Sequence, residues 1–226
     1  MTARVLFAIN AVLAWIGIVL STILSAGDYY PVNTTDPGLY GNNPVGAAGF
    51  LGREIDHFSY FTVWSNLLLA IIMTLLAINP NRTSSIFRVL RLDALVMMIV
   101  TGVIFNLLLN SGAHEGWDYW SNSIVHVWGP LLTFIVFILC GPRRWINSGT
   151  IFAALILPLL WLAYALIRGS VIGAYPYGFL DVNANGMASV LGFVAQMVIF
   201  AIILGYLLML IDWLMRKLFP NSRIAA

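Results

Sequence analysis

Thr62 and His126 are the two residues of this chain whose types best suit covalent chemistry. Each lies about three residues inside the same end of an apolar stretch, so both fall at nearly the same depth if these stretches cross a membrane. A histidine can take the proton of a threonine hydroxyl and so make it a nucleophile. The two residue types would permit acyl transfer, but their spacing alone assigns a catalytic role to neither of them.

A structural interpretation of the same two residues stays open. Threonines in membrane helices commonly hydrogen-bond to the carbonyl of residue i−4 in their own helix. A single intramembrane histidine can bond across to another helix and hold the bundle together. Spacing along the sequence does not decide between these roles and catalysis.

Five further polar residues fall near that depth or on the same helix faces: Ser65, Asn66, Asn106, Asn122 and Tyr164. Ser65 and Asn66 follow Thr62 by three and four residues, which places all three on one helix face. Asn122 precedes His126 by four residues and shares its face in the same way. These residues are candidates for supporting or substrate-binding roles.

Some of these polar groups are candidates for specific catalytic roles. Asn66 or Asn106 is a candidate donor to an oxyanion, and Asn122 could orient the imidazole. Asp118 and Glu115, in an outer loop, are candidates for the third member of a triad. The alternative for the asparagines and serines is simple hydrogen bonding between helices.

Pro130 follows His126 by four residues and should distort the helix there. Its ring clashes with the carbonyl of residue i−4, and it has no N–H to bond that carbonyl. We expect the His126 carbonyl to be left for a water or a neighbouring side chain. Two polar faces at one depth, one of them beside a distorted helix, indicate a cavity that opens toward the outer leaflet.

The composition excludes several classes of protein. Of 226 residues, 61% are hydrophobic and 9% charged, against about 25% charged in soluble domains. The net charge of +2 gives no basic surface for nucleic acid. The single cysteine, Cys140, excludes a disulfide framework, and three histidines on separate segments give no metal-ligand spacing. We predict a polytopic membrane protein with no metal and no cofactor.

Six apolar stretches are long enough to cross a bilayer as helices. They lie at about 5–25, 59–79, 92–110, 123–140, 150–168 and 187–212. They lack the period-2 alternation of barrel strands, and no internal repeat of fixed period is visible. The sequence predicts one all-α domain over residues 1–226, a bundle of six transmembrane helices.

The arginines and lysines predict how this bundle is oriented. Nine of the eleven lie in the segments on one side of the predicted bundle. The other side holds only Arg53 and Arg168, with seven of the nine acidic residues. Short cytoplasmic loops carry the excess of Lys and Arg, so both termini should be cytoplasmic. The first apolar run, about 20 residues, exceeds the hydrophobic region of a signal peptide and is expected to stay as a helix.

The first outer loop, residues 26–58, is long for a connection between helices. It contains three prolines and six glycines and shows no obvious regular structure. Such loops are usually lids, binding loops or disordered. The triplet Asn33-Thr34-Thr35 fits a glycosylation acceptor.

Three segments resemble one family of membrane proteins. They are Tyr60-Phe61-Thr62-Val63, then Trp120-Ser121-Asn122 with His126 and Pro130, and last Tyr175-Pro176-Tyr177-Gly178-Phe179 with Asp181. In order and spacing they resemble the androgen-induced protein and androgen-dependent TFPI-regulating protein family, and its bacterial relatives in particular. The interval from His126 to Pro130 is one residue shorter than in that family, and Ser65 stands where the family has Asp or Asn.

The resemblance implies a six-span threonine hydrolase that cleaves fatty acid esters of hydroxy fatty acids. Thr62 would be its nucleophile and His126 its partner, and a fatty acyl ester would enter sideways among membrane lipids. The alternative is a non-enzymatic carrier or sensor that binds a lipid or small solute in the same layer, or a structural protein. We expect a multi-pass protein of the plasma membrane, while the sequence leaves the oligomeric state open.

Overall fold

A computed structural model describes residues 3–109, 114–141 and 143–218 of the chain. Six helical stretches are long and apolar enough to cross a membrane. The described residues contain no strand, and a single parallel bridge joins Leu39 to Tyr175. The predicted all-α, six-span fold is confirmed. The last predicted span ran to 212, and the sixth helix continues to Leu218.

The six spans comprise eight α-helices and two π-helical turns. They are α1 (Ala3–Ala26), α3 (Phe61–Ile78), α4 (Ser85–Ile104) with a π turn at Phe105–Leu109, α5 (Gly116–Ser123) with a π turn at Ile124–Trp128 and then α6 (Gly129–Cys140), α7 (Ser148–Ala153) with α8 (Ile156–Ile172), and α10 (Met187–Leu218). Short helices lie between them: η1 (Gly46–Gly49), α2 (Phe50–His57), η4 (Gly178–Leu180) and α9 (Val182–Asn185). For the third and fourth spans the predicted starts, 92 and 123, were too late. Apolar windows miss polar helical ends such as the one that Ser84 caps by accepting from the Phe87 N–H.

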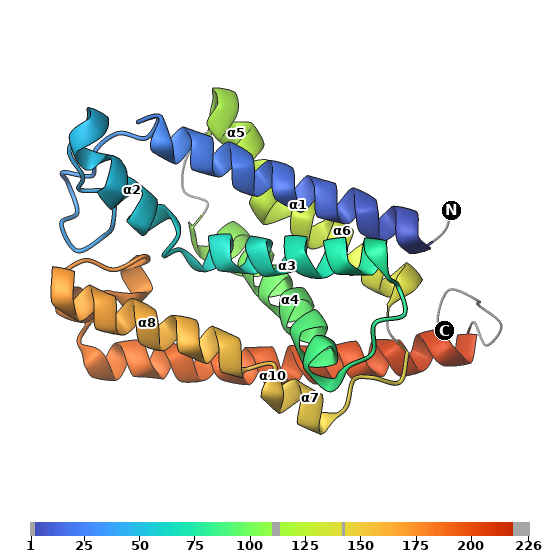
Figure 1. Cartoon of the computed structure of the whole chain (residues 1–226). Coiled ribbons are helices and arrows are strands. Elements are labelled where there is room, and N and C mark those ends of the chain that lie inside the picture. The colour runs from blue at the N-terminus through green and yellow to red at the C-terminus, as the bar shows by residue number, and fades with distance from the viewer. Residues whose placement is uncertain (1–2, 110–113, 142, 219–226) are drawn as a thin grey trace.

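The spans divide into a tight group and a looser pair (Figure 1). Buried residues of α1, α3, α4 and α6 form one core. A second core joins α4, α6 and α7 to α10. A third joins α8 to the start of α10 and to the loop before it, through Trp161, Ala165, Tyr175 and Val190. We call the end with residues 27–60 and 173–186 the loop end, and the end with residues 79–84 and 141–147 the arginine end.

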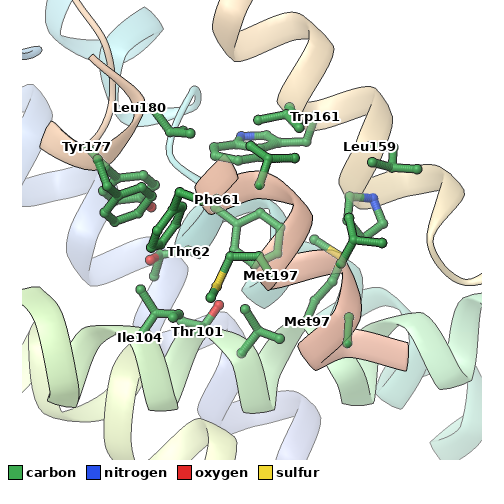
Figure 2. Close-up of a pocket in the computed structure, with 18 of the residues that line it drawn as sticks. Phe61, Thr62, Met97, Thr101, Ile104, Leu159, Trp161, Tyr177, Leu180 and Met197 are labelled. Carbon is green, nitrogen blue, oxygen red and sulfur yellow. The ribbon is translucent and has the colours of Figure 1, made fainter. Parts of the chain in front are cut away.

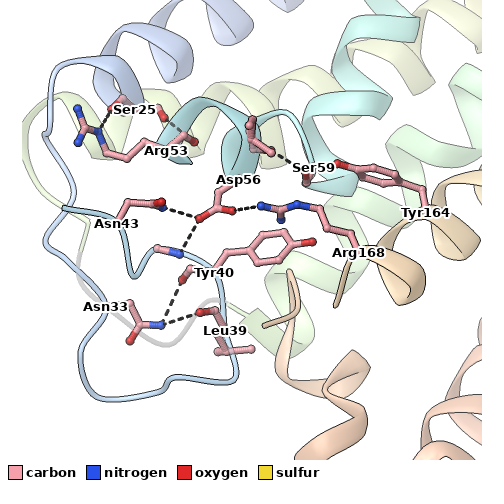
Figure 3. Close-up of polar contacts among 12 residues, drawn as sticks. Ser25, Asn33, Leu39, Tyr40, Asn43, Arg53, Asp56, Ser59, Tyr164 and Arg168 are labelled. Atoms are coloured by element: carbon pink, nitrogen blue, oxygen red, sulfur yellow. Dashed lines mark hydrogen bonds and ion pairs between the residues drawn. The ribbon is translucent and has the colours of Figure 1, made fainter. Parts of the chain in front are cut away.

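The segment 26–58 is more ordered than predicted. It contains η1 and α2, and its centre is Asp56 (Figure 3). One carboxylate oxygen of Asp56 lies 2.5 Å from Nη2 of Arg168 on α8. The other accepts from the Gly41 N–H at 3.1 Å and from the Asn43 amide at 2.6 Å. The Arg168 guanidinium also lies over the Tyr40 ring, 4.3 Å from its centre. These contacts fasten the loop to α8, so it forms a fixed cover at the loop end.

Asn33, in the predicted glycosylation triplet, stabilises this loop through the hydrogen bonds of its side chain. Its Nδ2 donates to the carbonyls of Asp36, Leu39 and Tyr40, and its Oδ1 accepts from the Asp36 N–H. The nitrogen that would carry a glycan is therefore bonded inside the loop.

The attachment of the loop before α10 can be tested at Gly169. A Cβ at this position would lie 2.1 Å from the Tyr175 ring, which is buried and fixed by backbone bonds to Gly38 and Tyr40. We expect Gly169→Ala to lower stability by about 1–3 kcal/mol because the overpacked ring has no free direction. Thermal unfolding in detergent measures this. Gly192→Ala on α10, where nothing lies within 4 Å of the added carbon, is the matched control and should not lower the melting temperature. Equal melting temperatures for both variants would contradict this packing.

Candidate functional site

Thr62 and His126 meet at the loop end of the bundle. Thr62 is the second residue of α3, and its Oγ1 lies 3.1 Å from Nε2 of His126. His126 sits in the π turn of the fourth span and is 9% exposed. When Nε2 carries no proton, the hydroxyl donates to it, which is the arrangement that prepares a threonine for nucleophilic attack. The predicted contact between the two residues is therefore present.

The imidazole of His126 is held by an aromatic ring. Phe105 stacks on it with ring centres 3.7 Å apart and planes 10° apart. Phe105 opens the π turn of the third span, so two π turns face each other across the site. The other imidazole nitrogen, Nδ1, is buried without a hydrogen-bond partner among the described residues. Stacking against Phe105 therefore restricts the orientation of the imidazole.

Pro130 distorts the fourth span as predicted. The π turn Ile124–Trp128 ends just before α6, in whose first turn Pro130 lies. The His126 carbonyl accepts a hydrogen bond from Asn106 Nδ2 at 3.4 Å. Asn106 therefore donates to the carbonyl that Pro130 leaves without a helical N–H partner. This bond stabilises the turn around His126.

Ser65 and Asn66 hold the start of α3 in place. The Ser65 hydroxyl lies 2.9 Å from the Thr62 carbonyl, to which it donates, and 2.9 Å from the Thr101 hydroxyl on α4. The Asn66 amide donates to the carbonyls of Thr62, at 2.9 Å, and Val125, at 3.3 Å. It bridges α3 to the π turn that carries His126. The donors of Asn66 are engaged with backbone carbonyls, so the prediction that they serve an oxyanion is not supported by this geometry.

Asn106 and Tyr164, two of the other predicted supporting residues, make no hydrogen bond with the Thr62 hydroxyl. Asn106 donates to the carbonyls of Gly102, at 2.8 Å, and His126, so its donors too are engaged with backbone. Tyr164 bonds the Ser59 hydroxyl at 2.7 Å and stacks on Trp64. Both are structural contacts in the described chain.

Asn122 does not orient the imidazole through its side chain. Its amide donates to Asp118, at 2.5 Å to Oδ1, and lies 3.3 Å from His114 Nδ1. Asp118 in turn lies 2.6 Å from His114, not beside His126. The prediction failed because helical spacing shows which residues share a face, while a neighbouring loop residue, His114, decides where the two side chains turn.

A large apolar cavity lies on the other side of Thr62 (Figure 2). Its interior volume is about 130 Å³. Its walls come from the start of α3, from α4, α8 and α10, and from the loop before α10. The polar side chains in this lining are Thr62, Thr101, Tyr177 and Trp161, and the Trp161 indole already donates to the Ser59 carbonyl. The cavity therefore suits a hydrocarbon chain with one polar group near Thr62.

Tyr177 is the functional candidate that sequence reasoning did not single out. Figure 2 shows it beside Phe61 and Thr62 in the cavity wall. Burial raises its pKa to about 12, while hydrogen bonding with the Thr62 hydroxyl and with the Phe61 and Thr62 amides opposes the rise. The first amides of a helix have no acceptor within it, and the Tyr60 side chain does not cap α3. Tyr177 therefore lies at the start of α3, next to Thr62 in the cavity wall.

No protein-family model, curated protein or solved structure matches the chain. The described residues contain no group of three or more His, Cys, Asp or Glu side chains placed to hold a metal ion. The function must therefore be argued from the site itself.

Substitution of Asn66 separates its structural role from a role in turnover. Asn66→Ala leaves the buried Val125 carbonyl without this donor, so we expect a loss of about 1–3 kcal/mol in stability. Asn106→Ala, at an exposed position, should have a smaller effect. Thermal unfolding in detergent measures both. A fully stable Asn66→Ala protein would contradict the bridging role given to Asn66 here.

Proposed function

We propose that this chain is a membrane-embedded hydrolase of fatty acyl esters. The observation that carries the proposal is the contact between Thr62 and His126 at the wall of an apolar cavity. Intramembrane groups that ionise are costly and commonly functional. The resemblance to six-span threonine hydrolases supports the same conclusion through the same two residues.

The reaction follows the usual course of acyl transfer. The Thr62 oxygen attacks the ester carbonyl carbon while its proton moves to Nε2 of His126. The tetrahedral intermediate then expels the alcohol, which takes that proton, and leaves the acyl group on Thr62. Water attacks the acyl-threonine, gives a proton to His126, and releases the fatty acid as the threonine recovers its hydrogen.

The negative oxygen of the intermediate needs a hydrogen-bond donor beside the nucleophile. The Tyr177 phenol, which stays protonated because burial raises its pKa to about 12, lies next to Thr62 in the cavity wall and is the candidate donor. Preorganised donors of this kind commonly contribute the largest share of catalysis.

We also propose an orientation for the protein in the membrane. The excess of arginine and lysine at the arginine end supports cytoplasmic termini, with Thr62 near the outer leaflet. A lipid ester then reaches the cavity sideways, with its polar group near the interface. We place the protein in the plasma membrane.

Covalent labelling tests the assignment of Thr62 and His126. A fluorophosphonate probe should label the wild type, and both Thr62→Ala and His126→Ala should lose at least nine-tenths of the labelling, since removing either half of such a pair lowers reactivity by far more than tenfold. The measurement is in-gel fluorescence on purified protein, with melting curves to show that each variant is folded.

Thr74→Ala is the matched control for this experiment. Thr74 lies on the same helix and bonds the Ala70 carbonyl, the ordinary structural role of a membrane threonine. Its variant should label like the wild type. Labelling that persists in folded Thr62→Ala would assign the reactive residue elsewhere and contradict the mechanism.

The second candidate function is lipid binding without turnover. The almost wholly apolar lining of the cavity favours it, because such a lining holds a chain whether or not chemistry follows. The two functions differ in one outcome. A binding protein retains a fatty acyl ester intact, whereas the hydrolase releases its acid and alcohol.

A further inference from the structure

The lining of the cavity beside Thr62 reaches toward the arginine end, and we call the residues at this end its floor. Val96, Leu155 and Ala201 line this deep end. Val96 also belongs to the core that joins α4, α6, α7 and α10, and Ala201 packs against that core. A chain that enters beside Thr62 therefore meets packed protein and not a continuous channel.

Close contact between α7 and α10 makes the floor. Ile151 of α7 is 2% exposed and lies against Gly205 of α10, where an added Cβ would be 2.8 Å from the Ile151 side chain. Leu208, on the next turn of α10, is fully buried in the same core. Helices this close leave no room for a hydrocarbon between them.

A break in the fifth span opens the space above the floor. The fifth span, predicted at 150–168, is present at Ser148–Ile172, but it contains a break, because α7 ends at Ala153 and α8 begins at Ile156. From this point α4 runs away from α10 toward α3, while α8 follows α10 (Figure 1). The cavity fills the wedge between them and ends where they converge.

The depth of the cavity can be estimated along its walls. Thr62 lies beside Ile104 and Thr101 in Figure 2, and Val96 is eight residues from Ile104 along α4. At about 1.5 Å per residue the floor lies roughly 12 Å from Thr62. On α10, the distance from Val194 to Ala201 is roughly 10 Å on the same basis. An extended chain advances about 1.3 Å per carbon, because its C–C bonds are about 1.5 Å long.

We propose that this cavity is an acyl site that selects medium-length chains, of about eight to ten carbons, by the position of its floor. The inference rests on the proposed hydrolase function and names its substrate class more closely. The acyl chain points from Thr62 to the floor, and the alcohol part leaves through the open side. The residues that set the length are Val96, Leu155 and Ala201.

The test is the dependence of hydrolysis on chain length. Purified protein in detergent is given 4-nitrophenyl esters of straight-chain acids from four to sixteen carbons, and kcat/KM is measured for each. We expect a maximum near eight to ten carbons. Every assay uses the same detergent and the same ester concentrations, and kcat/KM of each variant is divided by that of the wild type at every length.

Ala201→Phe raises the floor and is the decisive variant. It should lower kcat/KM for the ten-carbon ester at least tenfold relative to the four-carbon ester, since a chain that no longer fits loses methylene contacts. Ile203→Phe adds the same ring on the same helix, at a side chain 53% exposed, and should keep the wild-type profile. Val96→Ala deepens the floor without adding bulk, and should move the maximum toward longer chains even where Ala201→Phe fails to fold.

The outcomes separate the inference from the function on which it rests. A wild-type profile without a maximum, or a profile that neither floor variant moves, overturns the length selection and leaves the hydrolase intact. Hydrolysis of no ester at any length overturns the proposed function, and the acyl site with it.

Discussion

The structure depends on one constraint: inside a bilayer the backbone N–H and C=O groups must find their hydrogen-bond partners within the protein. Around Thr62 the partners are backbone carbonyls that distorted helices set free. The Asn66 amide donates to the Val125 carbonyl, and the Asn106 amide donates to the His126 carbonyl in the same π turn. These bonds hold α3 and the fourth span at a fixed distance. The 3.1 Å contact between Thr62 and His126 is a consequence of this spacing. The asparagines that the sequence suggested for chemistry thus hold Thr62 and His126 in contact.

The cover at the loop end extends the same arrangement outward. Asp56 and Arg168 join the first outer loop to α8. Tyr40, under the Arg168 guanidinium, contacts the Tyr60 ring, and Tyr60 contacts Tyr177 in the cavity wall. A continuous line of aromatic and charged contacts therefore runs from the loop to the hydroxyl of Thr62. This line of contacts joins the first loop to the wall of the cavity at the loop end.

Much of this could be predicted from the sequence, since membrane helices follow from apolar length and the depth of a residue follows from counting. Thr62 and His126 were brought together by depth alone, and Pro130 indicated the distortion beside His126. The sequence could not give the direction of a side chain on its helix. Asn122 turned to His114, and Phe105, an ordinary apolar residue by type, proved to fix the imidazole. Tyr177 lies far along the chain from Thr62, and only the folded loop shows that they meet.

The proposed reaction requires a covalent acyl-enzyme intermediate at Thr62. Its most direct test is mass spectrometry of the protein mixed with 4-nitrophenyl octanoate and quenched in acid during turnover. We predict one octanoyl group, on the peptide that contains Thr62, and none in His126→Ala. Release of nitrophenol with no acyl adduct, or an adduct on another residue, would contradict a threonine nucleophile.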